Sequence, residues 1–157
     1  MPAGATIEGM RRYEIMDVTG DAGIRAFGSG PVELFVNAAM AMYSLVTDPE
    51  TIEKKEKIEI SVQHTSLEGL VVSWLNELIF RFDAYGFMAR EINITSFRSP
   101  EDAAANTPKY SLSALLSGER FDPERHAGKL LIKAATYHRL KVEHARGLWS
   151  AEVIFDI

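Results

Sequence analysis

The sequence predicts an α+β fold, a single domain in which a largely antiparallel sheet has two amphipathic helices packed on it. Three observations support this prediction. Two segments place apolar side chains at helical spacing, and about seven shorter segments alternate apolar and polar residues as strands do. The later strand segments follow one another through short connections, which is typical of hairpins between antiparallel strands. This pattern does not set the order of the strands.

The first elements are a hairpin and a helix. Residues 13–18 alternate apolar and polar side chains, residues 23–28 form a second short strand, and a turn containing Gly and Asp joins them. Pro31 occupies a position favoured for the first helical residue, and Asp48-Pro49 ends the helix. The apolar face of this helix consists of Leu34, Phe35, Ala38, Ala39, Met42, Leu45 and Val46.

A second helix follows a strand predicted over residues 58–62. Ser66 is a suitable N-cap for this helix, and Gly86 marks its C-terminal end. Because its apolar residues recur at helical spacing, one face is expected to pack on the sheet. That face consists of Leu67, Leu70, Val71, Trp74, Leu75, Leu78, Ile79 and Phe82.

Strands and their connections make up the rest of the chain. Two prolines and a run of small polar residues predict a flexible loop over residues 99–109. Residues 121–126 predict a turn, and the Gly-containing segment 144–148 predicts a hairpin connection. Strands are expected over residues 88–97, 110–116, 130–143 and 149–157.

The composition excludes several classes of function. The net charge of −5 argues against nonspecific nucleic-acid binding through bulk charge, and no sequence-specific binding is expected either. The absence of cysteine excludes disulfides, thiolate zinc sites and a cysteine nucleophile. No apolar run is long enough to cross a bilayer, and residues 1–12 lack the apolar stretch of a signal peptide. We therefore expect a cytoplasmic protein with residues 1–12 as a flexible extension and one domain over residues 13–157.

Acidic residues stand in the first turn and at the end of the last strand. Asp17 and Asp21 belong to the turn, and the sequence stops at Asp156-Ile157 directly after an alternating strand. If the first and last strands pair, these carboxylates and the free carboxylate of Ile157 would form a compact anionic site for a hard cation. Two simpler interpretations stay open. Asp17 and Asp21 could be turn residues that bind their own backbone, and Asp156 could be a solvated edge residue.

Other chemistry has less support in the sequence. His138 lies within the strand predicted over residues 130–143, where a single histidine is more often a hydrogen-bonded structural residue than a ligand or a base. No pair of histidines has zinc-ligand spacing. The chain also lacks a phosphate-binding loop, a dinucleotide fingerprint and a nucleophile elbow, so no catalytic residue is assigned.

Several motifs in the chain resemble those of the archease family, and they occur in the family's order. The family's opening motif is approximately D-H-T-A-D-I-G-I-R-A-x-G, and its closing motif is D-I. The opening motif corresponds to DVTGDAGIRAFG at residues 17–28, W-L-N-E-L-L to residues 74–79, F-D-P-x-R-H to residues 121–126, K-A-x-T-Y-H-x-L-K-V-E to residues 133–143, and D-I to Asp156-Ile157. The resemblance thus implies an archease-like domain over residues 13–157.

This resemblance implies a protein cofactor without enzymatic activity of its own. Archease-type proteins activate the GTP-dependent RNA ligase that rejoins tRNA halves in tRNA splicing, because they promote its guanylylation and multiple turnover. The family binds a divalent cation, assigned as Ca²⁺, and Mg²⁺ and Mn²⁺ are further candidates. Carried over to this sequence, the implied ligands are Asp21, Asp156 and Ile157. Asp17, Lys133 and His138 are expected close to the ligands or in contact with the ligase.

The chain departs from the family's opening motif at two positions. Val18 replaces a histidine and Gly20 replaces an alanine, whereas the implied metal ligands are retained. These departures are expected to affect the potency of activation and the choice of partner more than the fold. Two other functions stay open: a metal-dependent hydrolase of phosphate esters that uses Asp17, Asp21 and Asp156, and a general chaperone or adaptor with a structural metal.

Overall fold

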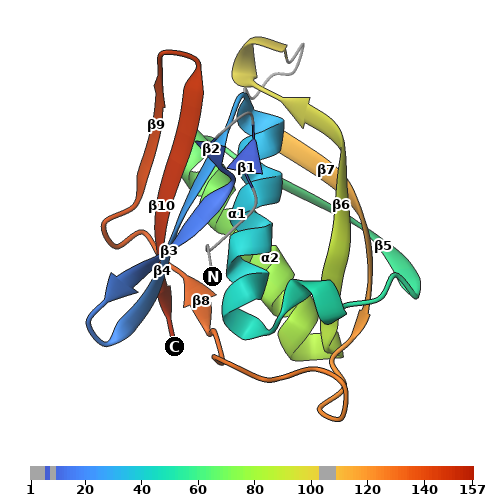
Figure 1. The fold of residues 1–157 in the computed structure, drawn as a ribbon. Coiled ribbons are helices and arrows are strands. Elements are labelled where there is room, and N and C mark those ends of the chain that lie inside the picture. The colour runs from blue at the N-terminus through green and yellow to red at the C-terminus, as the bar shows by residue number, and fades with distance from the viewer. Residues whose placement is uncertain (1–5, 8–9, 103–108) are drawn as a thin grey trace.

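The computed structural model describes residues 6–7, 10–102 and 109–157 and has two helices lying between two antiparallel sheets (Figure 1). The α+β class, the two helices and the antiparallel pairing are confirmed. The strands are divided between two main sheets instead of being gathered into one, so each helix has sheet on both sides. No helix in the described part of the chain is long and apolar enough to cross a membrane.

The larger sheet contains the first and last long strands of the domain. Its order is β3-β4-β10-β8, and β9 also pairs with β10. The predicted first hairpin is confirmed, and the predicted connection between the last two strands is a tight turn in which Gly147 has a φ of 76°. The bounds are β3 (Tyr13–Val18), β4 (Asp21–Gly28), β8 (Ala134–Ala135), β9 (Lys141–Ala145) and β10 (Leu148–Asp156).

The smaller sheet has the order β5-β7-β6, with β7 in the centre. Two register shifts interrupt the pairing of β6 with β7. Its strands are longer at their ends than the sequence predicted, because pairing to a neighbour extends them past the alternating residues. The bounds are β5 (Glu56–His64), β6 (Phe87–Arg98) and β7 (Tyr110–Arg120), and the short elements are β1 (Thr6–Ile7), β2 (Met10–Arg11), η1 (Pro49–Thr51) and η2 (Pro100–Asp102).

Both helices begin and end as their sequences predict. Helix α1 (Pro31–Val46) has proline at its start, and helix α2 (Leu67–Tyr85) is capped by Ser66, whose hydroxyl accepts a hydrogen bond from the Gly69 amide at 3.0 Å. Gly86 ends α2 with a φ of 75°. The helices are joined in the core, where the indole of Trp74 donates to the Phe35 carbonyl at 2.9 Å.

The prediction of a long strand over residues 130–143 is wrong. Only β8 and the start of β9 are strands there, and the rest of the segment is irregular. The amides of Lys129 and Leu130 bind the carbonyls of Val46 and Leu45 at the end of α1, at 2.9 and 3.0 Å. These hydrogen bonds satisfy carbonyls at the end of the helix, and the amides that make them are not available for pairing with a neighbouring strand. His138, predicted within that strand, lies in the loop between β8 and β9.

Two segments that were predicted to be flexible lie partly outside the described residues. In the loop over residues 99–109, residues 103–108 are not described, and Pro100–Asp102 forms η2. In the extension over residues 1–12, residues 1–5 and 8–9 are not described, and β1 and β2 pair as a short antiparallel ladder. The flexibility of both segments stays a prediction.

Candidate metal site at the end of the five-stranded sheet

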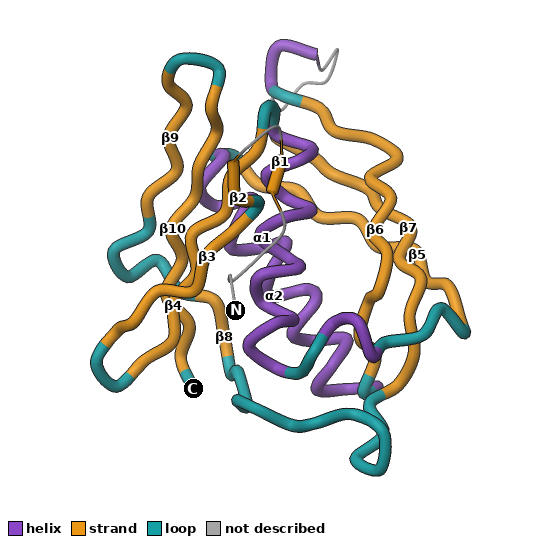
Figure 2. Tube along the Cα trace, in the orientation of Figure 1, coloured by secondary structure: helices purple, strands orange, loops and turns teal. Residues whose placement is uncertain are grey.

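Asp21 and Asp156 stand at one end of the pairing between β4 and β10. Asp21 begins β4 and Asp156 ends β10, and the antiparallel register pairs Phe155 with Ala22. Extending this register by one pair brings Asp156 opposite Asp21, where the Cβ atoms of facing residues are typically about 4.5–5.5 Å apart and lie on the same face. The C-terminus leaves the sheet at the end that carries the β3–β4 turn (Figure 2). The last strand thus pairs with β4, the second strand of the first hairpin, and not with the first strand, β3.

The electrostatics of this pair favour a cation. Both aspartates are exposed, and within the described ranges neither makes a side-chain hydrogen bond or an ion pair with a protein cation. Facing carboxylates repel one another and destabilise a strand pair unless a positive charge lies between them. Among described residues, no group of three or more His, Asp or Glu side chains could hold a metal ion. A cation here would thus need a further oxygen ligand, and Ile157 directly follows Asp156.

Asp17 is not brought together with this pair. The β3–β4 register pairs Asp17 with Ala22 and pairs Val18 with Asp21. Ala22 is buried at 5% exposure on the core side of the sheet, so Asp17 belongs to that face and Asp21 to the other. Val18, at the position of the family's histidine, therefore shares the face of Asp21.

The turn between β3 and β4 explains the second departure from the family motif. Thr19 and Gly20 form a two-residue connection, and Gly20 has a φ of 79°. Two-residue hairpin turns need a left-handed conformation that glycine adopts without steric cost. Gly20 consequently suits the tight turn that places Asp21 at the start of β4.

Lys133 lies beside Asp156 through its backbone. Its amide donates to the Asp156 carbonyl at 2.8 Å, and its side chain is exposed at the same end of the sheet. Both the amide and the hydroxyl of Thr136 donate to the Ile154 carbonyl, at 3.1 and 2.8 Å. His138 is exposed, and its amide donates to the Thr136 hydroxyl at 3.2 Å. The structure thus puts Lys133 next to the aspartate pair and His138 in the loop that follows.

Two further residues near this end were missed by the sequence analysis. Asn76 on α2 accepts a hydrogen bond from the Ala135 amide at 2.8 Å and donates to the Ala135 carbonyl at 3.2 Å. Arg25 lies between Glu14 and Glu152 on the same face as Asp21, and its Nε donates to Glu152 at 2.7 Å. The available signal for Asn76 was its place within the motif W-L-N-E-L-L at residues 74–79.

Arg25 does not neutralise the aspartate pair. The hydrogen bonds that Arg25 donates to Glu152 and then to Glu14 raise the pKa of Arg25 above its ordinary value. Its guanidinium charge is therefore shared between the carboxylates of Glu14 and Glu152. The negative charge of Asp21 and Asp156 at the sheet end is left without a protein counter-ion in the described part of the chain.

Comparison with known proteins identifies the family of this chain. The archease protein family matches residues 13–157, which is nearly the whole chain. The chain belongs to the archease family. The archease of Methanosarcina mazei is 34% identical over 147 residues, with 94% of this chain and 97% of the relative covered, and that of Pyrococcus furiosus is 35% identical over 149 residues, with 94% and 100% covered.

Two solved structures share the archease fold. Protein 1598 of Methanobacterium thermoautotrophicum superposes with a TM-score of 0.78 at 29% identity, covering 93% of this chain and 99% of its own. The archease of Thermotoga maritima, described as a possible chaperone, gives a TM-score of 0.58 at 18% identity, covering 90% and 94%. At that identity, the second comparison supports the fold alone.

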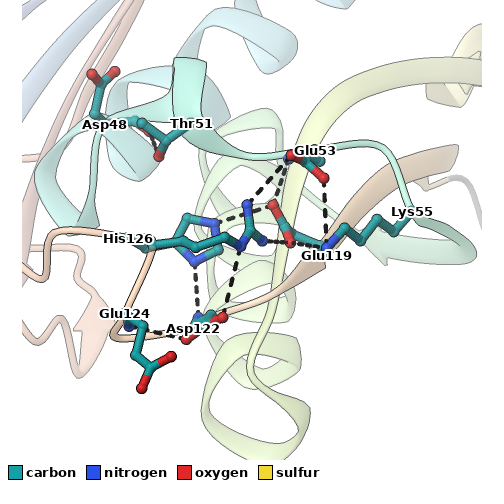
Figure 3. Close-up of polar contacts among 9 residues, drawn as sticks. Asp48, Thr51, Glu53, Lys55, Glu119, Asp122, Glu124 and His126 are labelled. Carbon is teal, nitrogen blue, oxygen red and sulfur yellow. Dashed lines mark hydrogen bonds and ion pairs between the residues drawn. The ribbon is translucent and has the colours of Figure 1, made fainter.

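The chain has a second polar cluster, away from the sheet end, around the buried Glu119 at the end of β7 (Figure 3). Glu119 accepts hydrogen bonds from the Glu53 amide at 2.6 Å and from the ring of His126 at 3.1 Å, and it also binds Arg125. Lys55 lies 3.5 Å from the Glu119 carboxylate. The cluster joins the segment before β5 to the turn over residues 121–126, so it supports the fold of the archease motif F-D-P-x-R-H.

Proposed function

We propose that this member of the archease family is a non-enzymatic activator of a GTP-dependent tRNA-splicing RNA ligase in the cytoplasm. It would promote guanylylation of the ligase and allow the ligase to turn over repeatedly. Membership of the archease family supports a role together with a partner protein. The observation that carries the proposal is the β4–β10 register, whose last pair, Ala22 with Phe155, is followed by Asp21 and Asp156 at one end of the domain.

The proposed site holds a divalent cation, with Ca²⁺ as the first choice and Mg²⁺ or Mn²⁺ as alternatives. Asp21, Asp156 and the carboxylate of Ile157 would be the ligands, since they are hard oxygen donors of the kind that these ions prefer. The two aspartates suit this role because they directly follow the last pair of the β4–β10 register, Ala22 with Phe155, and lack a protein counter-ion in the described residues. When bound, the cation would supply concentrated positive charge at the tip of the domain, where oxyanions of a nucleotide or of the ligase could be stabilised.

The residues around the aspartates would contact the ligase. Lys133 has an exposed side chain and a backbone amide bound to the Asp156 carbonyl, and His138 is exposed in the following loop. Asp17 lies on the other face of the sheet, so it would act in partner contact and not as a ligand. These side chains are proposed to engage the ligase or its nucleotide, because a Lys ammonium pairs well with phosphate oxygens.

A ligation time course with the matching RNA ligase tests the proposal. Substoichiometric amounts of the wild-type protein should increase the number of turnovers and the yield of guanylylated ligase. Asp156→Asn should lose this effect, and Asp83→Asn, which removes an exposed carboxylate on α2, should retain it. Equal activation by both variants, or none by the wild type, would contradict the proposed role.

The chaperone alternative is kept because the Thermotoga maritima relative is described as a possible chaperone. A general chaperone would prevent aggregation of unrelated unfolded proteins, and Asp156→Asn would not alter that activity in a folded variant. A hydrolase would alter RNA or nucleotide without the ligase. Both activities are measured on the isolated protein, so each can be separated from ligase activation.

A further inference from the structure

Strand β8 is held in place by one side chain of helix α2. Ala134–Ala135 forms the edge of the five-stranded sheet beyond β10, and Ala135 is buried at 5% exposure. A buried backbone amide and carbonyl need hydrogen-bond partners, and water is excluded from this position. The Asn76 side chain provides both partners, at 2.8 Å to the Ala135 amide and 3.2 Å from its own amide to the Ala135 carbonyl.

The Asn76 amide acts here as a substitute for a neighbouring strand. A carboxamide has an acceptor and two donors, so one planar group can satisfy the amide and the carbonyl of the same residue. Its position is fixed by the core, because Trp74, Leu75 and Leu78 on α2 are fully buried. The contact therefore links the end of the sheet to the close-packed core.

Strand β8 in turn holds the last residues of β10. Ala134 and Ala135 pair with Asp156 and Phe155, the Lys133 amide binds the Asp156 carbonyl, and the Thr136 amide binds the Ile154 carbonyl. Strand ends fray unless they are tied to neighbouring elements. Without β8, the end of β10 would be supported on one side only, by β4.

We infer that Asn76 is a positioning residue for the proposed cation site: it fixes β8, and β8 sets the place of Asp156 and of Lys133. The effect on cation binding rests on the proposed function, but the positioning of β8 by Asn76 is measurable without a cation or a ligase. Asn76 is an interior residue of α2 and makes its contact with backbone, so it acts through β8 and not as a ligand.

Amide hydrogen exchange in Asn76→Ala tests the positioning. The exchange rates of the Lys133 and Thr136 amides should rise about ten- to hundred-fold, because the buried groups of Ala135 lose both partners. Asn37→Ala is the matched control, since Asn37 is buried on α1 and donates to the Phe27 carbonyl at the other end of β4. Asn37→Ala should raise the exchange rates of the Lys133 and Thr136 amides only as far as it lowers the global stability of the fold.

Asn76→Asp gives a second measurement that does not depend on the alanine variant folding. Aspartate keeps the acceptor for the Ala135 amide and loses the donor to its carbonyl, so the rates should lie between those of wild type and Asn76→Ala. Wild-type exchange rates at Lys133 and Thr136 in a folded Asn76 variant, or equal increases in Asn37→Ala, would overturn the inference.

A cation titration connects the positioning to the proposed site. With Ca²⁺ alone as the probe, Asn76→Asp should bind about tenfold more weakly than wild type at a temperature where both are folded, and Asn37→Ala should bind as wild type does. Unchanged affinity in Asn76→Asp would refute the link to the site. If the wild type binds no cation, the proposed function fails on that point, and the exchange rates still decide whether Asn76 positions β8.

Discussion

The His126 ring donates from Nε2 to the Glu119 carboxylate at 3.1 Å, and both side chains are buried. The other ring nitrogen, Nδ1, accepts a hydrogen bond from the Asp122 amide at 2.8 Å, which assigns a neutral ring with its proton on Nε2. The Glu119 carboxylate also forms ion pairs with Arg125 and Lys55.

This cluster predicts that Glu119 stabilises the fold at neutral pH and loses that effect in acid. Burial alone would raise the pKa of Glu119, but the hydrogen bonds from the Glu53 amide and His126 and the charge of Arg125 outweigh it and lower the pKa from 4.5 to about 2. A depressed folded-state pKa gives stability that is present above the unfolded value and lost as pH falls toward the folded value. The relevant window is thus about pH 4.5 down to about pH 2.

Thermal unfolding of Glu119→Gln tests this prediction. The variant should be destabilised by about 1–3 kcal/mol at pH 7, and its difference from wild type should shrink as pH falls through the window. Glu124→Gln, which changes an exposed side chain in the same turn, should unfold as wild type does at each pH. A difference for Glu119→Gln that stays constant with pH would contradict the assigned pKa.

The aspartate pair should make the cation-free protein slightly less stable than its neutralised variants. Asp21→Asn or Asp156→Asn removes a like-charge repulsion across strands and should raise stability by up to about 1 kcal/mol without added cation. Ca²⁺ at about a hundredfold excess over its dissociation constant should stabilise the wild type by about 2.7 kcal/mol and neither variant. Calorimetry with and without Ca²⁺ measures both effects, and equal stabilisation of all three proteins would remove these residues from the ligand set.

Residues appended after Ile157 should weaken cation binding. An extension moves the terminal carboxylate away from Asp156 and leaves the side chains of Asp21 and Asp156 unchanged. We expect at least about a tenfold loss of Ca²⁺ affinity with a short Gly-Ser extension, because one charged oxygen ligand is lost. The same extension at the N-terminus serves as the control. If both forms bind Ca²⁺ equally, the carboxylate of Ile157 is not a ligand.

Restoring histidine at Val18 should increase ligase activation. Val18 pairs with Asp21, so an imidazole there lies on the face of the aspartate pair. If the family's histidine assists the ligase chemistry, Val18→His should raise guanylylation at unchanged Ca²⁺ affinity. Activation at the wild-type level would show that this position is structural in this protein.

The helices and the first hairpin were predictable because their signals are local. Apolar spacing, the Ser66 cap, Gly86 and the turn at Gly20 each act within a few residues. The failure over residues 130–143 has a different cause. Its backbone is bound by the carbonyls of Leu45 and Val46 and by Asn76, and such distant partners leave no periodic pattern in the sequence.

The candidate site was predictable only in part for the same reason. The carboxylates of Asp21 and Asp156 are visible in the sequence, but their pairing depends on a register between strands far apart in the chain. The separation of Asp17 onto the other face follows from the β3–β4 register, which a one-residue slip would reverse. The metal ligands themselves stay a prediction.

The pairing of β4 with β10 also determines when the larger sheet can finish folding during synthesis. Strand β4 leaves the ribosome early, but its partner is encoded by residues 148–156, so one edge of β4 has no strand to bind while the intervening residues are made. The helices and the smaller sheet can form from residues that emerge before then. A nascent chain arrested before β10 would therefore expose an open strand edge, and the Asp21 carboxylate would acquire its neighbour in one of the last steps of folding.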